Sequence, residues 1–278
     1  RLGDYTIEKL LGAGGMGAVY LARSPSRGEV ALKVMHAQAA LDEHVRRRFL
    51  REARVTTALD HPNVVRILES FEHHGKPVIV MEVLHGQSLT SVLEREPKQP
   101  LARISALFAR VVSAVGTAHA MGLVHRDLKP DNIFLIDGEP FVKVLDFGIA
   151  KLRKGFGLEE SSALTKTGML LGTPYYMSPE QAFGEKTIDH RADLWSLGLI
   201  LYEGLAGILP TRADTLHEVL KRVLAADFER LDRVDPAIPR DVADLVASML
   251  QRERDARPGD LREVFHVLSR HAGALEKA

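Results

Sequence analysis

Several things are missing from this sequence, and each absence narrows what the protein can be. Its 278 residues include no cysteine, which rules out disulfides, thiolate nucleophiles and cysteine-ligated zinc. Basic and acidic residues both number 37, so no net charge favours nucleic acid or an acidic membrane surface. Residues 194–210 are the most apolar stretch, but Glu203 and three glycines interrupt it. It falls short of the roughly 18 apolar residues of a membrane span. We expect a buried helix there, no nucleic-acid partner and no membrane contact by this chain.

What is present is typical of a globular protein. Hydrophobic residues make up 45% of the chain and charged residues 27%, which is ample material for a core. The lack of cysteine suits a reducing compartment, so we expect a cytoplasmic location. The chain begins with Arg1 rather than methionine, which suggests an excerpt from a longer protein.

The first third of the chain is predicted to be rich in strands. Short runs of alternating apolar residues occupy 5–11, 17–23 and 29–36, and turns with glycine or Ser-Pro separate them. This pattern predicts an antiparallel meander. Two further strands are predicted at 65–72 and 77–82, joined by a polar turn.

A helix is predicted between these two groups of strands, over residues 42–59. Val45, Phe49, Glu52 and Thr56 follow one another at spacings of three and four, so they share one face of that helix. This face therefore carries a glutamate among apolar residues.

Beyond Gly86 the pattern becomes helical. Apolar residues from 104 to 115 form a helical stripe, and later helices are expected near 188–204, 215–225, 240–250 and 261–268. The second part of the chain is therefore predicted to be mainly α.

A glycine-rich run separates the first two predicted strands. Gly12, Gly14 and Gly17 stand in G-x-G-x-x-G order, with Val19 two residues later. Taken alone, this pattern also fits a plain hairpin or a dinucleotide-binding turn. A dinucleotide fingerprint needs a helix that begins at the glycines, whereas here a second strand follows. Because glycines let backbone N–H groups approach phosphate oxygens closely, we expect a phosphate-binding loop.

Lys33 stands sixteen residues after Gly17, in the run VALK of the third predicted strand. Its ammonium group can contact the α and β phosphates of a nucleotide and pair with Glu52 on the helix. An exposed strand lysine is the plainer alternative. The glycine loop before Lys33 and the glutamate after it favour the functional interpretation.

The run HRDLKPDN, which begins at His125, is the most specific motif in the chain. It resembles the catalytic loop of eukaryotic-like (Hanks-type) protein kinases, and all eight positions match in register. The resemblance implies that Asp127 accepts the proton of the substrate hydroxyl, that Asn132 binds Mg²⁺ and that Lys129 steadies the γ-phosphate. It also implies that Arg126 receives an activation-loop phosphate, while His125 packs and hydrogen-bonds within the loop.

The triplet DFG begins at Asp146, fourteen residues after Asn132 and after two short apolar runs. The resemblance makes Asp146 the second metal ligand and Phe147 a supporting residue. Oxygen ligands suit the divalent cation that neutralises the charge of ATP. The expected cofactors are ATP and Mg²⁺, with Mn²⁺ as a substitute for Mg²⁺.

The run GTPYYMSPE, which ends at Glu180, resembles the end of the family's activation segment, with Ser178 where alanine is usual. Thr165 and Thr167 resemble the autophosphorylation sites of bacterial receptor-like Ser/Thr kinases. A phosphate there would carry about −1.5 to −2 charges and could pair with Arg126. A solvated, threonine-rich loop is the alternative.

Three more residues receive supporting roles from the resemblance. Thr173 is expected to contact the catalytic loop, Asp193 to hold the backbone of that loop, and Arg257 to pair with Glu180. Buried charges without partners are costly, which also favours paired roles for Asp193 and Arg257.

The resemblance also places the nucleotide base. Met81 falls at the gatekeeper position, and Glu82 to Leu84 form the hinge whose backbone would bind adenine. The residues expected around ATP are Leu11, Gly12, Ala13, Gly14, Gly15, Met16, Gly17, Val19, Ala31, Lys33, Met81, Glu82, Leu84 and Phe134. For each apolar residue, simple core packing is the alternative.

The expected fold is α+β with two lobes, a small antiparallel β lobe with one main helix and a larger, mainly α lobe. We expect one kinase domain over 1–278, with the N-lobe at about 1–82, the hinge at about 83–86 and the C-lobe at about 87–270. The expected function is transfer of the γ-phosphoryl group of ATP to serine or threonine hydroxyls of proteins, with activation by autophosphorylation.

Two alternatives compete with this interpretation. A pseudokinase or nucleotide-binding scaffold would have lost Lys33, Asp127 or Asp146, and all three are present. A tyrosine kinase would usually carry an arginine-containing variant of the KPDN stretch.

The GGMGAVY loop and the YMSPEQA run resemble bacterial receptor-like kinases. That resemblance implies protein substrates, self-association of kinase domains and tethering of the full-length protein to a membrane.

Overall fold

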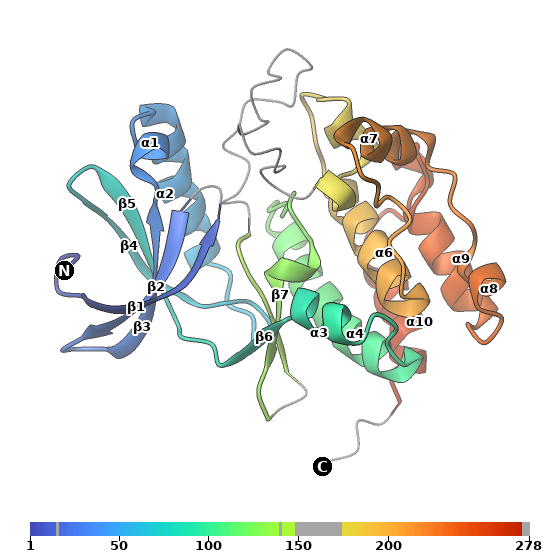
Figure 1. Cartoon of the computed structure of the whole chain (residues 1–278), viewed down its shortest axis with the longest axis horizontal. Coiled ribbons are helices and arrows are strands. Elements are labelled where there is room, and N and C mark those ends of the chain that lie inside the picture. The colour runs from blue at the N-terminus through green and yellow to red at the C-terminus, as the bar shows by residue number, and fades with distance from the viewer. Residues whose placement is uncertain (15–16, 139–140, 148–173, 274–278) are drawn as a thin grey trace.

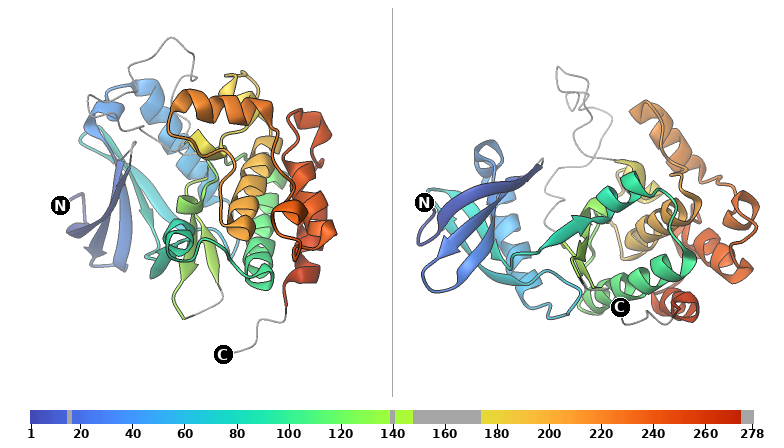
Figure 2. Two further views of the ribbon diagram at one scale, coloured as in Figure 1. Left: turned by 45° about the vertical axis from the view of Figure 1, so that its right-hand side comes forward. Right: turned by 60° about the horizontal axis from the view of Figure 1, so that its bottom comes forward.

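The computed structural model describes residues 1–14, 17–138, 141–147 and 174–273 of the chain. In one helix, α2 (Glu43–Thr57), the backbone is described throughout but some side chains are not. The side chains left out are those of His44, Val45, Arg48, Arg51, Glu52, Arg54 and Val55. A sheet-based lobe and a helical lobe lie side by side in Figure 1, and Figure 2 shows them from two further sides. The predicted two-lobed α+β architecture is confirmed.

The N-lobe is built on a five-stranded antiparallel sheet. Its strands are β1 (Thr6–Gly14), β2 (Gly17–Ser24), β3 (Gly28–Met35), β4 (Ile67–His73) and β5 (Lys76–Met81). Their order in the sheet is β1-β2-β3-β5-β4, so the predicted meander over the first three strands and the later hairpin are both confirmed. The sequence pattern does not reveal that β5, rather than β4, pairs with β3. The connection from β3 to β4 runs through α2, and β4 enters at the far edge of the sheet.

Helix α2 follows the short helix α1 (Ala37–Ala40) and packs against β4 and β5. Phe49, Ala53 and Thr56 are buried on its inner face, because spacings of three and four residues place them on one side of a helix. Phe49 and Thr56 belong to the predicted face. The side chains of Val45 and Glu52, the other members of that face, are outside the described residues.

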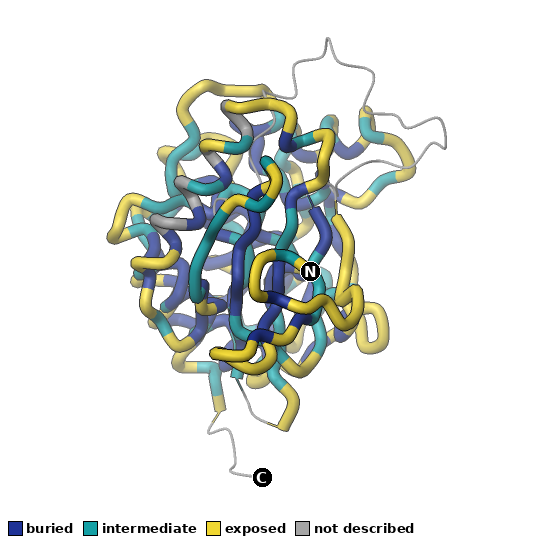
Figure 3. Tube along the Cα trace, turned by 90° about the vertical axis from the view of Figure 1, so that its left-hand side faces the viewer, coloured by how far each residue is buried: buried dark blue, intermediate teal, exposed yellow. Residues whose placement is uncertain are grey.

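Alternation along the central strands gives the N-lobe two small cores, one on each face of the sheet. Ile79 of β5 packs with Ala31, Met35 and Phe49 on the α2 side. Val78 and Val80 point the other way, into a cluster with Leu32 and Tyr5 among others. Figure 3 shows these buried strands from the N-lobe side of the molecule. β1 is exposed along its whole length. β1 is therefore held to the lobe mainly by its backbone pairing with β2.

The C-lobe is mainly helical. Its helices are α3 (Leu89–Arg95), α4 (Leu101–Ala120), α5 (Pro179–Ala182), α6 (Arg191–Ala206), α7 (Leu216–Ala225), α8 (Leu231–Val234), α9 (Arg240–Met249) and α10 (Arg262–His271). Among the described residues of this lobe there are also short 3₁₀ turns at η1 (Pro130–Asn132), η3 (Pro174–Tyr176) and η4 (Arg254–Ala256). The predicted helices near 188–204, 215–225, 240–250 and 261–268 correspond to α6, α7, α9 and α10.

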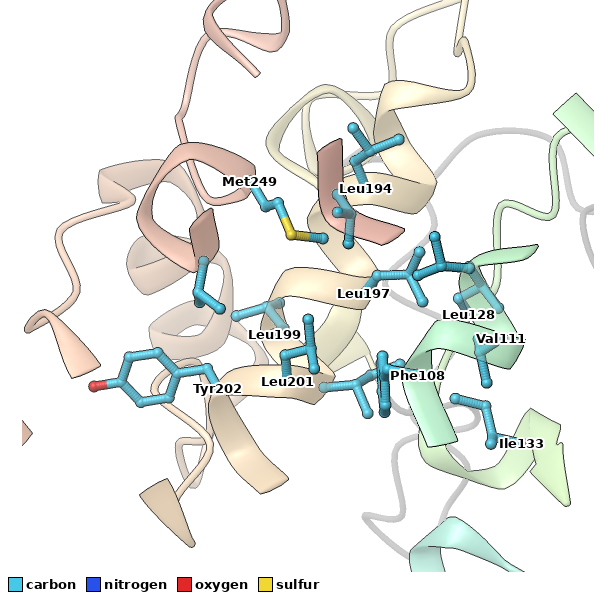
Figure 4. Close-up of a cluster of buried hydrophobic side chains, with 14 of the residues drawn as sticks. Phe108, Val111, Leu128, Ile133, Leu194, Leu197, Leu199, Leu201, Tyr202 and Met249 are labelled. Carbon is cyan, nitrogen blue, oxygen red and sulfur yellow. The ribbon is translucent and has the colours of Figure 1, made fainter. Parts of the chain in front are cut away.

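Helix α6 is the centre of the C-lobe. Every residue from 192 to 205 is buried, so this helix is covered on all sides, and the predicted buried helix is confirmed. Figure 4 shows its leucines packing between Phe108 and Val111 of α4 on one side and Met249 of α9 on the other. The helix ends at Ala206 because Gly207 takes a left-handed conformation, with φ of 74°.

Helix α4 is long and apolar enough, by length and composition alone, to cross a membrane. Half of the residues in its most apolar 18-residue stretch are buried inside the protein. The helix packs against α10 and α6, and the stripe predicted between 104 and 115 faces this core. These contacts are those of the core helix of a globular lobe.

A second sheet lies where the two lobes meet. It has three strands in the order β6-β7-β8: β6 (Gly86–Ser88), β7 (Ile133–Ile136) and β8 (Val142–Val144). β7 and β8 are the two short apolar runs that precede DFG. Residues 82–85 connect β5 to β6, and they are therefore the link from the N-lobe sheet to the C-lobe.

Candidate active site

The loop that begins at His125 is held in place by one carboxylate from α6. Asp193 is fully buried, and its two oxygens accept hydrogen bonds from the backbone N–H groups of His125 and Arg126 at 2.8 and 2.7 Å. The ring of His119 adds a third contact, with its Nε2 atom 2.8 Å from Asp193 Oδ2. Burial alone would raise the pKa of Asp193, but these donors hold that pKa below its usual range. Asp193 therefore stays ionised and fixes the loop backbone.

His125 connects this loop to the DFG segment. Its Nε2 atom lies 2.8 Å from the carbonyl oxygen of Leu145, while Nδ1 accepts the backbone N–H of Asp127 at 3.3 Å. The two contacts together assign the neutral ring with its proton on Nε2. The ring also packs at 4.9 Å from the ring of Phe147, which is buried. The side chain thus packs and hydrogen-bonds within the loop.

Three polar side chains of the loop lie close together. The Lys129 ammonium is 3.5 Å from Oδ2 of Asp127, and Asp127 is 37% exposed, so its carboxylate is open to a ligand. The Nδ2 atom of Asn132 donates to the backbone carbonyl of Asp127 at 2.8 Å. Because that contact uses the amide nitrogen, the amide oxygen of Asn132 is the atom left for a cation.

Lys33 of β3 contacts Asp146 across the junction of the lobes. The ammonium lies 2.5 Å from Oδ1 of the carboxylate. Burial alone would raise the pKa of Asp146, but the Lys33 charge holds that pKa below its usual range, so the carboxylate is charged at neutral pH. Asp146 itself has φ of 57°, a left-handed conformation that is uncommon for aspartate. The side chain of Glu52 is outside the described residues, so its predicted contact with Lys33 stays a prediction.

The three glycines of the β1–β2 hairpin have different surroundings. A Cβ atom on Gly17 would lie 2.3 Å from the carbonyl oxygen of Val34, so glycine is required there by packing against β3. A Cβ atom on Gly12 or Gly14 would meet no atom within 4 Å. These two glycines border open space, which is what a phosphate group needs. Gly15 and Met16, also predicted to contact ATP, are outside the described residues, while Leu11 and Ala13 are exposed on β1.

The residues predicted around adenine come from several elements. Ala31 and Met81 are buried in the cluster beneath α2, and Val19 and Leu84 pack against that cluster. Phe134 alternates along β7 with Ile133, which faces the C-lobe core, so Phe134 faces the opposite side. Glu82 begins the segment that links the lobes. The residues predicted around adenine therefore belong to β2, β3, β5, the linking segment and β7, and their contact with the base stays a prediction.

The described part of the activation region begins at Pro174. Glu180, in α5, forms a buried pair with Arg257, whose guanidinium gives both carboxylate oxygens a hydrogen bond of 2.8 Å. Thr165, Thr167 and Thr173 lie outside the described residues, so their predicted roles stay predictions.

A model of the family described as the protein kinase domain matches residues 5–269 of this chain. The chain belongs to the protein kinase domain family. The prediction of a Hanks-type serine/threonine kinase domain, similar to bacterial members, is confirmed by this match and by the named relatives.

Among curated proteins, this kinase domain is similar to three bacterial kinases. It is 44% identical to the serine/threonine-protein kinase pkn3 of Myxococcus xanthus over 76% of this chain and 39% of the relative. It is 37% identical to pkn2 of the same organism over 98% of this chain and 33% of the relative. It is 39% identical to the DNA damage-responsive serine/threonine-protein kinase RqkA of Deinococcus radiodurans over 95% of this chain and 39% of that relative. The chain thus spans between a third and two fifths of the length of these relatives.

A solved structure gives the same family. The crystal structure of the PknI kinase domain of Mycobacterium tuberculosis superimposes on this kinase domain with a TM-score of 0.74 and 27% sequence identity. The match covers 98% of this chain and 97% of the solved chain.

Sequence reasoning missed some residues that shape the site of this kinase domain. His119 shares Asp193 with the loop, yet a histidine near the end of a helix carries no distinctive pattern. Leu145 packs against the same cluster as Val19 and Leu84. Its position directly before Asp146 is the signal that could have added it to the residues predicted around adenine.

Proposed function

We propose that this kinase domain transfers the γ-phosphoryl group of ATP to serine or threonine hydroxyls of proteins. The observation that carries the proposal is the geometry of two pairs of charged groups. Asp127 and Lys129 stand on a loop that Asp193 holds rigidly, and Lys33 and Asp146 pair at the other side of the same junction. Positioning and charge stabilisation are the main requirements of phosphoryl transfer.

Each of these groups has one task in the proposed reaction. Asp127 orients the substrate hydroxyl and accepts its proton while the oxygen attacks the γ-phosphorus. The bond from that phosphorus to the bridging oxygen breaks, and ADP leaves with the bonding electrons. Lys129 steadies the γ-phosphate, and Lys33 contacts the α and β phosphates.

The oxygen donors fit a divalent cation. Asp146 is ionised, and the amide oxygen of Asn132 is the free end of a side chain whose nitrogen already donates to the loop. We propose that Asp146 and Asn132 hold Mg²⁺, with Mn²⁺ as a substitute. The ion would neutralise the charge of the β and γ phosphates. Lys33 and Asp146, which now neutralise one another, would then exchange partners, with phosphate taking the ammonium and the metal taking the carboxylate.

We propose that phosphorylation of Thr165 or Thr167 by a second kinase domain activates the enzyme. The support comes from Arg126, whose Nε atom is buried and has no hydrogen-bond partner among the described residues. The side chain makes one long contact, of 3.5 Å, with the carbonyl oxygen of Ile188. A phosphate could provide the missing partner, because guanidinium and phosphate form strong charge-assisted hydrogen bonds.

The test is incubation of the purified domain with labelled ATP, Mg²⁺ and a generic basic protein, followed by mapping of phosphosites. Lys33→Met removes the phosphate contact, and Lys76→Met, at the exposed turn of β4 and β5, is the matched control. We expect label on serine and threonine in the wild type and in the control, and a loss of roughly 10²-fold or more in Lys33→Met.

Three results would count against the proposal. ATP binding without any label would favour a pseudokinase or a scaffold. Label confined to tyrosine would overturn the substrate class. Equal label in Lys33→Met and the control would remove Lys33 from the mechanism.

A further inference from the structure

Lys143 of β8 contacts Glu82, the first residue of the linking segment. Its neighbours Val142 and Val144 point into the C-lobe core, so by strand alternation Lys143 points the other way. Its Nζ atom lies 2.7 Å from Oε1 of Glu82 and 3.2 Å from the carbonyl oxygen of Val64. The Lys143 side chain is 15% exposed and that of Glu82 is 29% exposed. This ion pair is therefore partly withdrawn from water, where charge pairs are stronger than at the surface.

Glu82 is held by its backbone as well as by its side chain. Its N–H group donates to the carbonyl oxygen of Arg66 at 3.1 Å, and its carboxylate accepts the N–H group of Arg66 at 2.8 Å. The same carboxylate oxygen accepts the Lys143 ammonium. Glu82 is thus bonded both to Arg66, in the segment before β4, and to Lys143 of β8.

The segment before β4 is itself bonded to β8. The N–H group of Val65 donates to the carbonyl of Val144 at 3.0 Å, and the N–H group of Val144 donates to Asn63 at 2.8 Å. β8 therefore lies between β7 and residues 63–65. Three residues beyond Lys143, the same chain reaches Asp146. One lysine thus connects the segment predicted to bind adenine with the strand that leads to the predicted metal ligand.

We propose that Lys143 is a positioning residue that fixes the linking segment relative to β8. A bound nucleotide can then contact the predicted adenine site with its base while its phosphates lie next to Asp146. The inference rests on the proposed function, because it concerns the same nucleotide site. If the Lys143–Glu82 pair is lost, the backbone pairing of β8 with residues 63–65 remains, but Glu82 loses its anchor to the C-lobe. Adenine binding should weaken, while the phosphate contacts of Lys33 and the glycine loop should not change.

The test compares a ligand that has the base with one that lacks it. Dissociation constants for Mg-ATP and for Mg-tripolyphosphate are measured by calorimetry, and KM and kcat are measured in the labelling assay. For Lys143→Met we expect the ATP Kd and KM to rise roughly 10- to 100-fold, the range that corresponds to one hydrogen bond between charged groups. Tripolyphosphate binding should not change, and kcat at saturating ATP should stay within about threefold of the wild type.

Matched variants make the result specific. Glu82→Gln should reproduce the loss in part, because an amide keeps the shape but not the charge. Lys143→Arg should restore ATP affinity, because the guanidinium keeps both the charge and the hydrogen-bond donors. Lys98→Met breaks another lysine pair, with Asp235 at 2.6 Å on the far part of the C-lobe, and should change none of these values. If Lys143→Met fails to fold, Glu82→Gln carries the test.

The outcomes separate this inference from the proposed function. ATP affinity equal to the wild type in Lys143→Met overturns the positioning role. Equal weakening of ATP and tripolyphosphate also overturns it, because that result indicates general damage to the site. A fall in kcat without a change in KM does the same. Failure of the wild type to bind or use ATP would instead refute the proposed function.

Discussion

Replacing Arg257 by methionine tests how far one buried ion pair stabilises the helical lobe. The Arg257 side chain is fully buried, Glu180 is 4% exposed, and two hydrogen bonds of 2.8 Å join them. The other N–H groups donate to the carbonyl oxygens of Arg191, Gln251 and Arg252 at distances from 2.8 to 3.0 Å. All five N–H groups of the guanidinium are therefore used.

Methionine fills much of the same volume but leaves the Glu180 carboxylate buried without a cation. Removal of one partner of a buried ion pair costs about 3–5 kcal/mol, and we expect the free energy of unfolding at pH 7 to fall by that amount. Arg257→Lys should cost less, because the ammonium keeps the charge but donates at most three hydrogen bonds. Adding Glu180→Gln to the methionine variant should restore part of the loss, because no unpaired charge remains.

The pH dependence sharpens this test. Burial alone would raise the pKa of Glu180, but the hydrogen bonds and charge of Arg257 hold that pKa below its usual 4.5. A lowered carboxyl pKa stabilises the folded state above the unfolded-state value, and this contribution is lost as the pH falls through the folded pKa. In Arg257→Met, burial dominates and the carboxyl pKa rises. The difference in stability between wild type and variant should therefore be smaller at pH 5 than at pH 7.

The assay is urea unfolding at both pH values, followed by far-ultraviolet circular dichroism and by the fluorescence of Trp195, the single tryptophan. The ring of Trp195 lies 5.1 Å below the guanidinium carbon, so fluorescence also reports local changes. Coincident transitions justify the two-state free energies. A loss below about 1 kcal/mol, the range of surface ion pairs, would refute the reasoning, and so would a difference that grows toward acid pH.

Three further outcomes are expected. Asp127→Asn should slow phosphoryl transfer by roughly 10²- to 10⁴-fold in single-turnover assays while ATP affinity by calorimetry stays near the wild-type value, and wild-type turnover would remove the proton-acceptor role. Gly17→Ala should lower the thermal unfolding temperature because its Cβ atom would collide with Val34, whereas Gly12→Ala should leave it unchanged; equal effects in calorimetric scans would contradict this. Asp193→Asn should lower kcat by roughly 10-fold or more with little change in ATP Kd, because one buried loop amide loses its acceptor, and unchanged kcat would show that the loop needs no such anchor.

The local patterns of the chain were enough to predict its fold. Alternating apolar runs predicted β1, β2 and β3, and spacings of three and four residues predicted α2 and α4, because these periods follow directly from backbone geometry. A nearly continuous apolar stretch predicted the buried helix α6. Short elements escaped prediction. β6 has three residues, and α5 and α8 have four each, which is too short for a period to be visible.

The polar residues of the site also fall into two groups, those that the sequence pattern indicates and those that only the structure shows. The spacing of His125, Asp127 and Asn132 was visible in the sequence because these residues are consecutive or nearly so. The partners that hold this loop were only partly visible. The predicted contact of Asp193 followed from family resemblance, whereas His119 contacts Asp193 across 74 positions of sequence and no local pattern indicates it. The partner of Lys33 also depends on how the lobes meet, and in this structure it is Asp146.

The sequence by itself determined the family, most strands and helices in their order along the chain, and the residues predicted to carry the chemistry, because each depends on residue types at fixed local spacing. The tertiary structure alone decided which distant groups meet: Lys33 with Asp146, Lys143 with Glu82, and the placement of β5 between β3 and β4. The physical reason is that a contact between distant positions depends on the packing of whole elements. That packing buries the apolar faces of all elements together, so it cannot be predicted from any single segment of the sequence.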